Sequence, residues 1–143
     1  MDYKHSSHST FDLKYHVVFC TKYRYRILTG EIAVRTREII RETCVTNYVD
    51  IVSGNITPDH LHMLISMPPS IALSKLIQYI KGKSSRKLFQ EFEQLKKRYW
   101  GQHLWARGYF AVTVGNVNST DVQKYIEEQG VHHKHNNFNI SEF

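Results

Sequence analysis

Two histidines separated by one apolar residue are the clearest candidate for chemistry in this sequence. They stand in the run PDHLHMLI at residues 58–65. Side chains alternate between the two faces of a β-strand, so His60 and His62 project from one face while their apolar neighbours project from the other. Two imidazoles on one face can share a metal ion. The alternative is a pair of polar residues on a solvated sheet face, since metal centres usually need a third ligand.

A second candidate lies toward the C-terminus, where a tyrosine and a glutamine stand four residues apart. Thr120 and Gln123 form a capping box, which predicts a helix over residues 121–129. Four residues advance a helix by about 40° beyond one turn, so Tyr125 and Gln129 lie on nearly the same face. This helix can present a phenol and a carboxamide together. The spacing is equally compatible with a boundary aromatic and a solvent-facing amide.

The basic residues form a third feature, because they are concentrated in one quarter of the chain. The 143 residues carry a formal net charge of +6. Residues 71–107 hold nine Lys and Arg against two Glu, a balance of +7, which leaves −1 for the remainder. Basic residues interleaved with aromatics are typical of proteins that bind a nucleic-acid backbone and stack on its bases. A solvated amphipathic helix with its aromatics in the core is the alternative.

These candidates must be positioned by a small α+β fold. Alternating and β-branched patterns predict strands over residues 11–22, 48–56, 60–67 and 109–114. Helical periodicity predicts further helices over residues 31–46, 73–81 and 84–92, with a break or kink at Gly82. The order β-α-β-β-α-β-α predicts a ferredoxin-like or RRM-like four-stranded antiparallel sheet with helices on one face. We expect one domain over residues 1–143 with a flexible tail over 131–143.

Composition excludes several other classes of protein. Hydrophobic residues make up 41% of the chain, which is enough for a folded core. No apolar run approaches the roughly 18 residues that span a bilayer, and the N-terminus lacks an apolar signal core. Cys20 and Cys44 lack Cys-x-x-Cys spacing, which indicates two reduced thiols. We therefore expect a cytoplasmic protein with no membrane partner, and we find no glycine-rich phosphate loop or dinucleotide fingerprint.

Several segments together resemble one known family. The run PDHLHMLI resembles the histidine-hydrophobe-histidine (HUH) motif of nucleases that act on single-stranded DNA. Residues 107–117 (RGYFAVTVGNV), followed by 124–129 (KYIEEQ), look like the C-terminal signature of single-tyrosine transposases, the transposase A proteins of the IS200/IS605 insertion sequences. The strand YHVVF at 15–19 and the stretch KGKSS at 81–85 look like that family as well. The resemblance covers nearly the whole chain.

The resemblance implies an activity and a set of site residues. Such a transposase cleaves and rejoins single-stranded DNA at hairpin-bearing element ends through a 5′-phosphotyrosine intermediate, with Mg²⁺ or Mn²⁺ and without ATP. Tyr125, on a C-terminal catalytic helix, would be the nucleophile. The metal ligands would be His60, His62 and Gln129. The basic segment supplies the candidate DNA contacts, which are Lys75, Lys81, Lys83, Arg86, Lys87 and Arg107.

The resemblance also implies a homodimer, in which the tyrosine helix of one subunit completes the histidine pair of the other. Two alternatives stay within the same fold: a domesticated, repeat-associated transposase and a non-catalytic module that binds hairpin DNA. A ferredoxin-like metabolite or RNA binder is a third alternative. It would show no preference for single-stranded DNA and no metal dependence.

Overall fold

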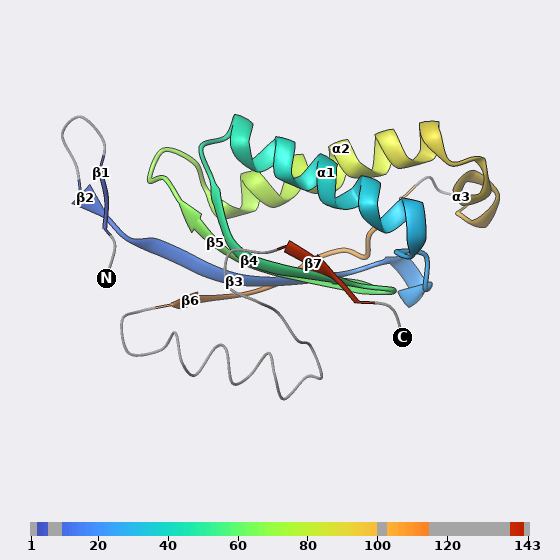
Figure 1. The fold of residues 1–143 in the computed structure, drawn as a ribbon, viewed down its shortest axis with the longest axis horizontal. Helices are drawn as coiled ribbons and strands as arrows, with labels where there is room; N and C mark the ends of the chain where they lie inside the picture. The colour runs from blue at the N-terminus through green and yellow to red at the C-terminus, as the bar shows by residue number, and fades with distance from the viewer. Residues whose placement is uncertain (1–2, 6–9, 100–102, 115–137, 142–143) are drawn as a thin grey trace.

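The protein is a five-stranded sheet with two long helices on one face (Figure 1). The computed structural model describes residues 3–5, 10–99, 103–114 and 138–141. The elements, in chain order, are β1 (Lys4–His5), β2 (Thr10–Phe11), β3 (Leu13–Cys20), η1 (Lys22–Arg24), α1 (Gly30–Thr46), β4 (Asp50–Thr57), β5 (His60–Met67), α2 (Leu73–Glu91), α3 (Glu93–Arg98), β6 (Phe110–Val114) and β7 (Phe138–Ile140).

The sheet has the strand order β6-β3-β5-β4-β7. Strand β5 lies at its centre and pairs antiparallel with β3, from Leu13 opposite Met67 to Cys20 opposite His60. Strand β4 pairs antiparallel with the other side of β5, and β6 pairs antiparallel with β3. The predicted four-stranded antiparallel sheet of a ferredoxin-like α+β fold is therefore confirmed, and β7 adds a fifth strand.

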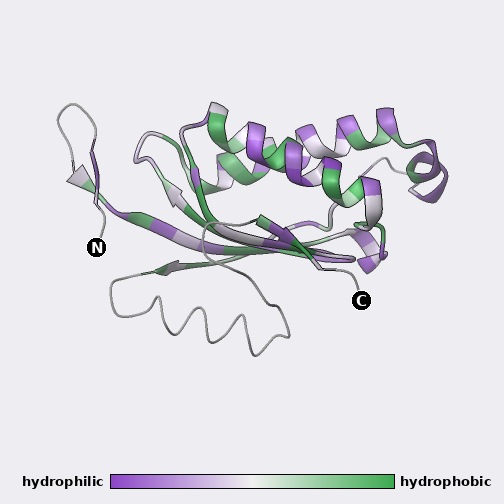
Figure 2. Ribbon diagram, in the orientation of Figure 1, coloured by the Kyte–Doolittle hydropathy of each residue, from purple (hydrophilic) through white to green (hydrophobic). Residues whose placement is uncertain are grey.

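The hydrophobic core lies between the sheet and helices α1 and α2. Both helices are amphipathic, and their ribbons alternate between hydrophobic and hydrophilic residues along their length (Figure 2). The apolar residues of β5 face them, since Leu61, Met63 and Ile65 are fully buried in one cluster with Ile40 and Ile80. In the described part of the chain, no helix has the length and apolar character needed to cross a bilayer.

Helix α2 runs without interruption through Gly82, so the predicted break at this glycine is wrong. A glycine inside a helix costs only about 1 kcal/mol relative to alanine. Buried residues on both sides of it, Ile80 and Leu88, hold the two halves of the helix against the core. Between them, the Ser84 hydroxyl donates to the Ile80 carbonyl and accepts a 2.8 Å hydrogen bond from Trp105 Nε1. Packing therefore outweighs the low helix propensity of the glycine.

The C-terminal segment contributes an ordered strand. Residues Phe138–Ile140 form β7, which pairs parallel with β4, and Phe138 is 2% exposed. The Phe138 ring lies against Gly54, where an added Cβ would be 2.5 Å from its Cδ1 atom. The tail over 131–143, which is predicted to be flexible, thus includes a short strand in which Phe138 is buried. The rest of that tail lies outside the described residues.

Candidate active site

The two histidines of β5 lie on the sheet face opposite the helices, as the strand alternation predicts. Leu61, between them, is fully buried in the core, and the side chains of His60 and His62 project the other way. Their rings meet edge to face, with centroids 4.9 Å apart. The Nε2 atoms of the two rings are 3.1 Å apart. Two neighbouring β-strand histidines thus direct the same ring atom to one point.

This separation fits a shared metal ion. Imidazole nitrogens bind divalent metals at about 2.0–2.2 Å, and two such ligands at roughly a right angle are about 3 Å apart. The nitrogen ligands suit Mn²⁺ at least as well as Mg²⁺, which prefers oxygen. Within the described ranges, no group of three His, Cys, Asp or Glu residues could hold a metal. A metal ion bound by this pair would need its remaining ligands from outside this set of described residues.

The other ring nitrogen of His60, Nδ1, lies within hydrogen-bond distance of two oxygen atoms. It lies 2.6 Å from Asp59 Oδ1 and 2.8 Å from Thr57 Oγ1. The Thr57 hydroxyl itself donates to the His60 carbonyl at 3.0 Å, so its oxygen is available to the ring as an acceptor. A proton on Nδ1 satisfies both oxygens and leaves the Nε2 lone pair for a metal.

Asp59 is charged in this arrangement. Burial of its carboxyl opposes ionisation, but hydrogen bonds and charges from His60 and Arg24 outweigh burial, and the pKa of Asp59 is lowered from its ordinary value. Asp59 and Thr57 are not among the site residues predicted from the sequence. Their proximity to His60 in the sequence is the signal that could have identified them, since Thr57 ends β4 and Asp59 lies in the two-residue turn before His60.

The second histidine is packed from the side by a third. The rings of His16 and His62 are stacked, with centroids 5.7 Å apart and an interplanar angle of 24°. His16 is fully buried and His62 is 5% exposed. Because β3 and β5 pair with Val18 opposite His62, His16 lies diagonally across from His62 on the same face. His16 is not among the site residues predicted from the sequence, since its position beside His62 depends on the register of β3 against β5.

The other predicted catalytic residues cannot be compared with this geometry. Tyr125 and Gln129, with the predicted helix 121–129 that carries them, lie outside the described residues. Their roles as nucleophile and metal ligand therefore stay predictions.

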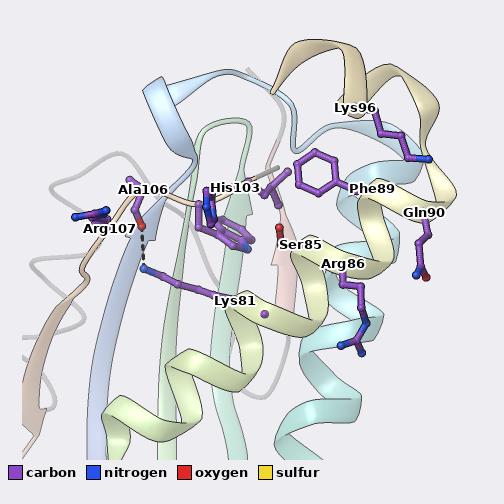
Figure 3. A pocket seen from close by; sticks show the side chains of 12 residues that line it. Lys81, Ser85, Arg86, Phe89, Gln90, Lys96, His103, Ala106 and Arg107 are labelled. Atoms are coloured by element: carbon purple, nitrogen blue, oxygen red, sulfur yellow. Dashed lines mark hydrogen bonds between the residues drawn. The ribbon is translucent and has the colours of Figure 1, made fainter. Parts of the chain in front are cut away.

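A cavity of about 640 Å³ gathers part of the predicted DNA-binding residues. It lies between α2 and the segment that precedes β6 (Figure 3). Among the predicted contacts, Lys81, Arg86 and Arg107 line it. Lys96 and His103, which the sequence analysis did not select, add further basic groups to its lining. The cavity is therefore strongly basic and has the charge needed to hold phosphates.

Lys81 has a structural part in this cavity. Its Nζ donates a hydrogen bond to the Ala106 carbonyl at 2.9 Å (Figure 3). It also donates to the Gly108 carbonyl at 2.6 Å. Burial lowers the pKa of Lys81. Because two of its three donors contact the backbone on either side of Arg107, Lys81 fixes the segment that carries this arginine.

The remaining predicted DNA contacts do not line the cavity. Lys87 pairs with Glu42 of α1 at 3.7 Å, on the side of α2 that faces the other long helix. Lys75 lies near the start of α2, with its Nζ 5.9 Å from the centre of the Tyr79 ring. Lys83 lies one turn before Lys87 in α2 and is half-buried. The basic segment thus divides into separate surfaces, which net charge alone could not show.

The cavity wall is tied to the histidine site through the backbone. Ala106 N donates to the Cys20 carbonyl at 2.9 Å, and Lys22 N donates to the Leu104 carbonyl at 2.8 Å. Cys20 is in turn the β3 residue paired with His60. The basic cavity and the histidine pair therefore share one continuous piece of the sheet and its adjoining loops.

Comparison with known proteins identifies the family of this chain. A family model described as "Transposase IS200 like" matches residues 9–129. The ISDra2 transposase TnpA of Deinococcus radiodurans is 36% identical over 119 residues, which cover 83% of this chain and 85% of that protein. The transposase for insertion sequence element IS200 of Salmonella typhimurium is 38% identical over 128 residues, covering 90% and 84% respectively.

Solved structures show the same fold. A crystallised Deinococcus radiodurans R1 protein, assigned as a transposase, superposes with a TM-score of 0.72 at 32% identity, covering 88% of this chain and 97% of that one. A REP-associated tyrosine transposase bound to a REP hairpin superposes with a TM-score of 0.60 at 14% identity, covering 89% and 69%. The second likeness concerns the fold alone. From its family match, its relatives and its fold, the chain belongs to the IS200-like transposase family.

Proposed function

We propose that this transposase cleaves and rejoins single-stranded DNA through a covalent bond between Tyr125 and a DNA 5′-phosphate. The observation that carries the proposal is the convergence of His60 Nε2 and His62 Nε2 at 3.1 Å, with His60 Nδ1 held by Asp59 and Thr57. Two converging ring nitrogens, with one ring oriented by hydrogen bonds from behind, are suited to binding a metal ion. Tyr125 is the residue that the family resemblance implies as the nucleophile.

In the proposed reaction, the Tyr125 phenolate oxygen bonds to the scissile phosphorus as the bond from phosphorus to the 3′-oxygen breaks. The phenol gives up its proton, and the leaving oxygen ends as a free 3′-hydroxyl. A 3′-hydroxyl can later attack the phosphotyrosine, which restores the phenol and rejoins the strand without ATP. His60, His62 and Gln129 would hold a divalent metal. When bound, Mg²⁺ or Mn²⁺ withdraws charge from the phosphate and favours attack on phosphorus.

The proposed substrate is single-stranded DNA whose element ends fold into hairpins. Support comes from the basic cavity, where Arg86, Arg107, Lys96 and His103 surround a space of about 640 Å³. Phe89 and Trp105 also line it. A fold relative was solved with a REP hairpin bound, although its low identity limits that support to the fold. We place Lys81 as an anchor of the cavity wall and Arg86 and Arg107 as direct phosphate contacts.

The experiment that tests this function uses labelled single-stranded element ends, the full chain and Mn²⁺. We expect a protein–DNA band that survives denaturation, because the phosphotyrosine bond is covalent. Tyr125→Phe lacks the nucleophilic oxygen and should give no such band while hairpin binding persists. If the wild-type chain binds the ends and yields no covalent product, the enzyme proposal fails and the hairpin-binding module is favoured.

We also propose that the active form is a homodimer whose sites combine residues of both subunits. Mixing His62→Ala with Tyr125→Phe chains tests this directly. If sites assemble across subunits, a mixed dimer has one site with no substitution and recovers cleavage. If each subunit completes its own site, every site in the mixture carries one substitution and cleavage stays absent.

A further inference from the structure

The turn that follows β3 has an unusual backbone. In η1, Tyr23 has φ of 61° and Arg24 has φ of 54°, both in the left-handed region. Side chains with a Cβ rarely adopt this conformation, and each instance costs on the order of 1 kcal/mol. Two in succession persist only where the surroundings hold them, and such places concentrate at functional sites.

The turn is held against the loop that precedes His60. Thr21 N donates to the Asp59 carbonyl at 2.9 Å, and the Thr21 hydroxyl lies 2.7 Å from the Tyr25 carbonyl and 3.2 Å from that of Asp59. Leu28 N donates to the Pro58 carbonyl at 2.9 Å. These hydrogen bonds hold the turn over residues 21–28 against the loop at residues 58–59. They connect the end of β3 to the loop that carries Asp59.

In this turn, the carboxylate of Asp59 contacts both Arg24 and His60. Arg24 Nη2 lies 3.2 Å from Asp59 Oδ2, while Asp59 Oδ1 accepts from His60 Nδ1 at 2.6 Å. The side chain of Asp59 is 16% exposed and that of Arg24 is 64% exposed. Arg24 therefore touches one carboxylate oxygen from the solvent side, and the other oxygen is directed at the ring.

We propose that Arg24 is a positioning residue for His60 and acts through Asp59. The proposal rests on the metal-binding role of His60 proposed above. By fixing Oδ2, Arg24 prevents the carboxylate from rotating away, so that Oδ1 keeps its bond to Nδ1–H and the ring keeps Nε2 directed at His62. Partners behind a metal-bound histidine set its tautomer and orientation, and their loss typically costs 10–100-fold in metal affinity.

The first test measures Mn²⁺ binding to the full chain without DNA, by the electron paramagnetic resonance signal of free Mn²⁺. We expect about tenfold weaker binding in Arg24→Gln, with Arg24→Lys between it and the wild type. Arg24→Gly is a second variant, because a φ of 54° suits glycine and the fold is kept while the guanidinium is lost. Lys22→Gln, in the same turn, is the matched control and should bind as the wild type does.

A second readout needs no metal. Long-range ¹⁵N–¹H NMR spectra of histidine rings report which nitrogen carries the proton. We expect His60 to be protonated on Nδ1 in the wild type and to become a mixture of tautomers in both Arg24→Gln and Arg24→Gly. An unchanged tautomer in these two variants would overturn the Arg24 proposal. If the tautomer responds but neither the wild type nor His60→Ala binds Mn²⁺, the metal role fails while the positioning role stands.

Discussion

The Nε2 atoms of His60 and His62 lie 3.1 Å apart, although only one residue separates the histidines along β5. The strand alternation puts both rings on one face, and the hydrogen bonds behind His60 turn its ring toward His62. In the proposed function, these two imidazoles would supply two ligands to a metal ion and leave positions open for a DNA phosphate. Loss of either ring should therefore weaken metal binding.

Replacing His62 with alanine should abolish DNA cleavage and weaken Mn²⁺ binding by at least tenfold, because one of two converging ligands is lost. Hairpin DNA binding should change little, since His62 is 5% exposed and does not line the basic cavity. Calorimetric Mn²⁺ titration and a hairpin gel-shift assay measure the two properties. His5→Ala is the control, because His5 lies in the β1–β2 hairpin and bonds only Thr10 among the described residues. Equal Mn²⁺ affinity in the two variants would contradict the assignment.

Arg86 and Lys87 are adjacent and equally charged, but the structure predicts different effects on DNA binding. Arg86 lines the basic cavity, whereas Lys87 pairs with Glu42. We expect Arg86→Ala to weaken hairpin affinity and to reduce the slope of log affinity against log salt by about one. Lys87→Ala should have a clearly smaller effect on both quantities. The measurement is fluorescence anisotropy of a labelled hairpin at several salt concentrations, and equal losses would show that the cavity is not the contact surface.

Two Gly→Ala substitutions should change stability in opposite directions. In Gly54→Ala the new methyl group would overlap the Phe138 ring, so we expect a loss of about 1–3 kcal/mol as β7 shifts. In Gly82→Ala the new methyl group would meet nothing within 4 Å beyond its chain neighbours and the backbone of its own helix, and alanine favours the helix by about 1 kcal/mol. Urea unfolding measures both changes.

Phe138→Ala provides a control for the glycine experiment. Once the ring is absent, Gly54→Ala should cost much less than it does in the wild type, because the overlap is removed. The double-mutant cycle measures this coupling free energy. Additive effects would show that the two residues do not interact.

Cys44 should resist thiol reagents in the native state. It is 1% exposed, and burial raises the pKa of its thiol from 9.0 to about 12. The reactive thiolate is therefore absent at neutral pH, while Cys20 is half-buried and more accessible. We expect one thiol to react with Ellman's reagent in native protein at pH 8 and two in urea. Rapid native labelling of Cys44, identified by mass spectrometry, would contradict this burial.

The same thiol predicts a loss of stability at high pH. Because the folded-state pKa is raised, the contribution of Cys44 is complete below about pH 9 and is lost as the pH rises toward 12. Over this range, the free energy of unfolding should fall more steeply in the wild type than in Cys44→Ala. Urea titrations at several pH values measure the difference, and parallel curves would show that Cys44 ionises equally in both states.

The sequence by itself determined the order of the main strands and helices along the chain through β6 and the placement of His60 and His62 on one face. These features depend on residue spacing within single elements, and a period of two or of 3.6 residues is visible without knowledge of any partner. The register of β3 against β5, and hence the stacking of His16 on His62, does not follow from either strand alone.

Only the tertiary structure decided which polar residues act together. The Arg24–Asp59 contact joins residues far apart in sequence, and it requires a strained turn that no local pattern predicts. Lys81 and Arg86 belong to the same basic run and both line the cavity, yet two backbone carbonyls accept hydrogen bonds from the Lys81 ammonium group. Parallel pairing of β7 with β4 depends on a ring fitting over a glycine. In each case the deciding free energy comes from contacts between segments that meet only when the chain folds.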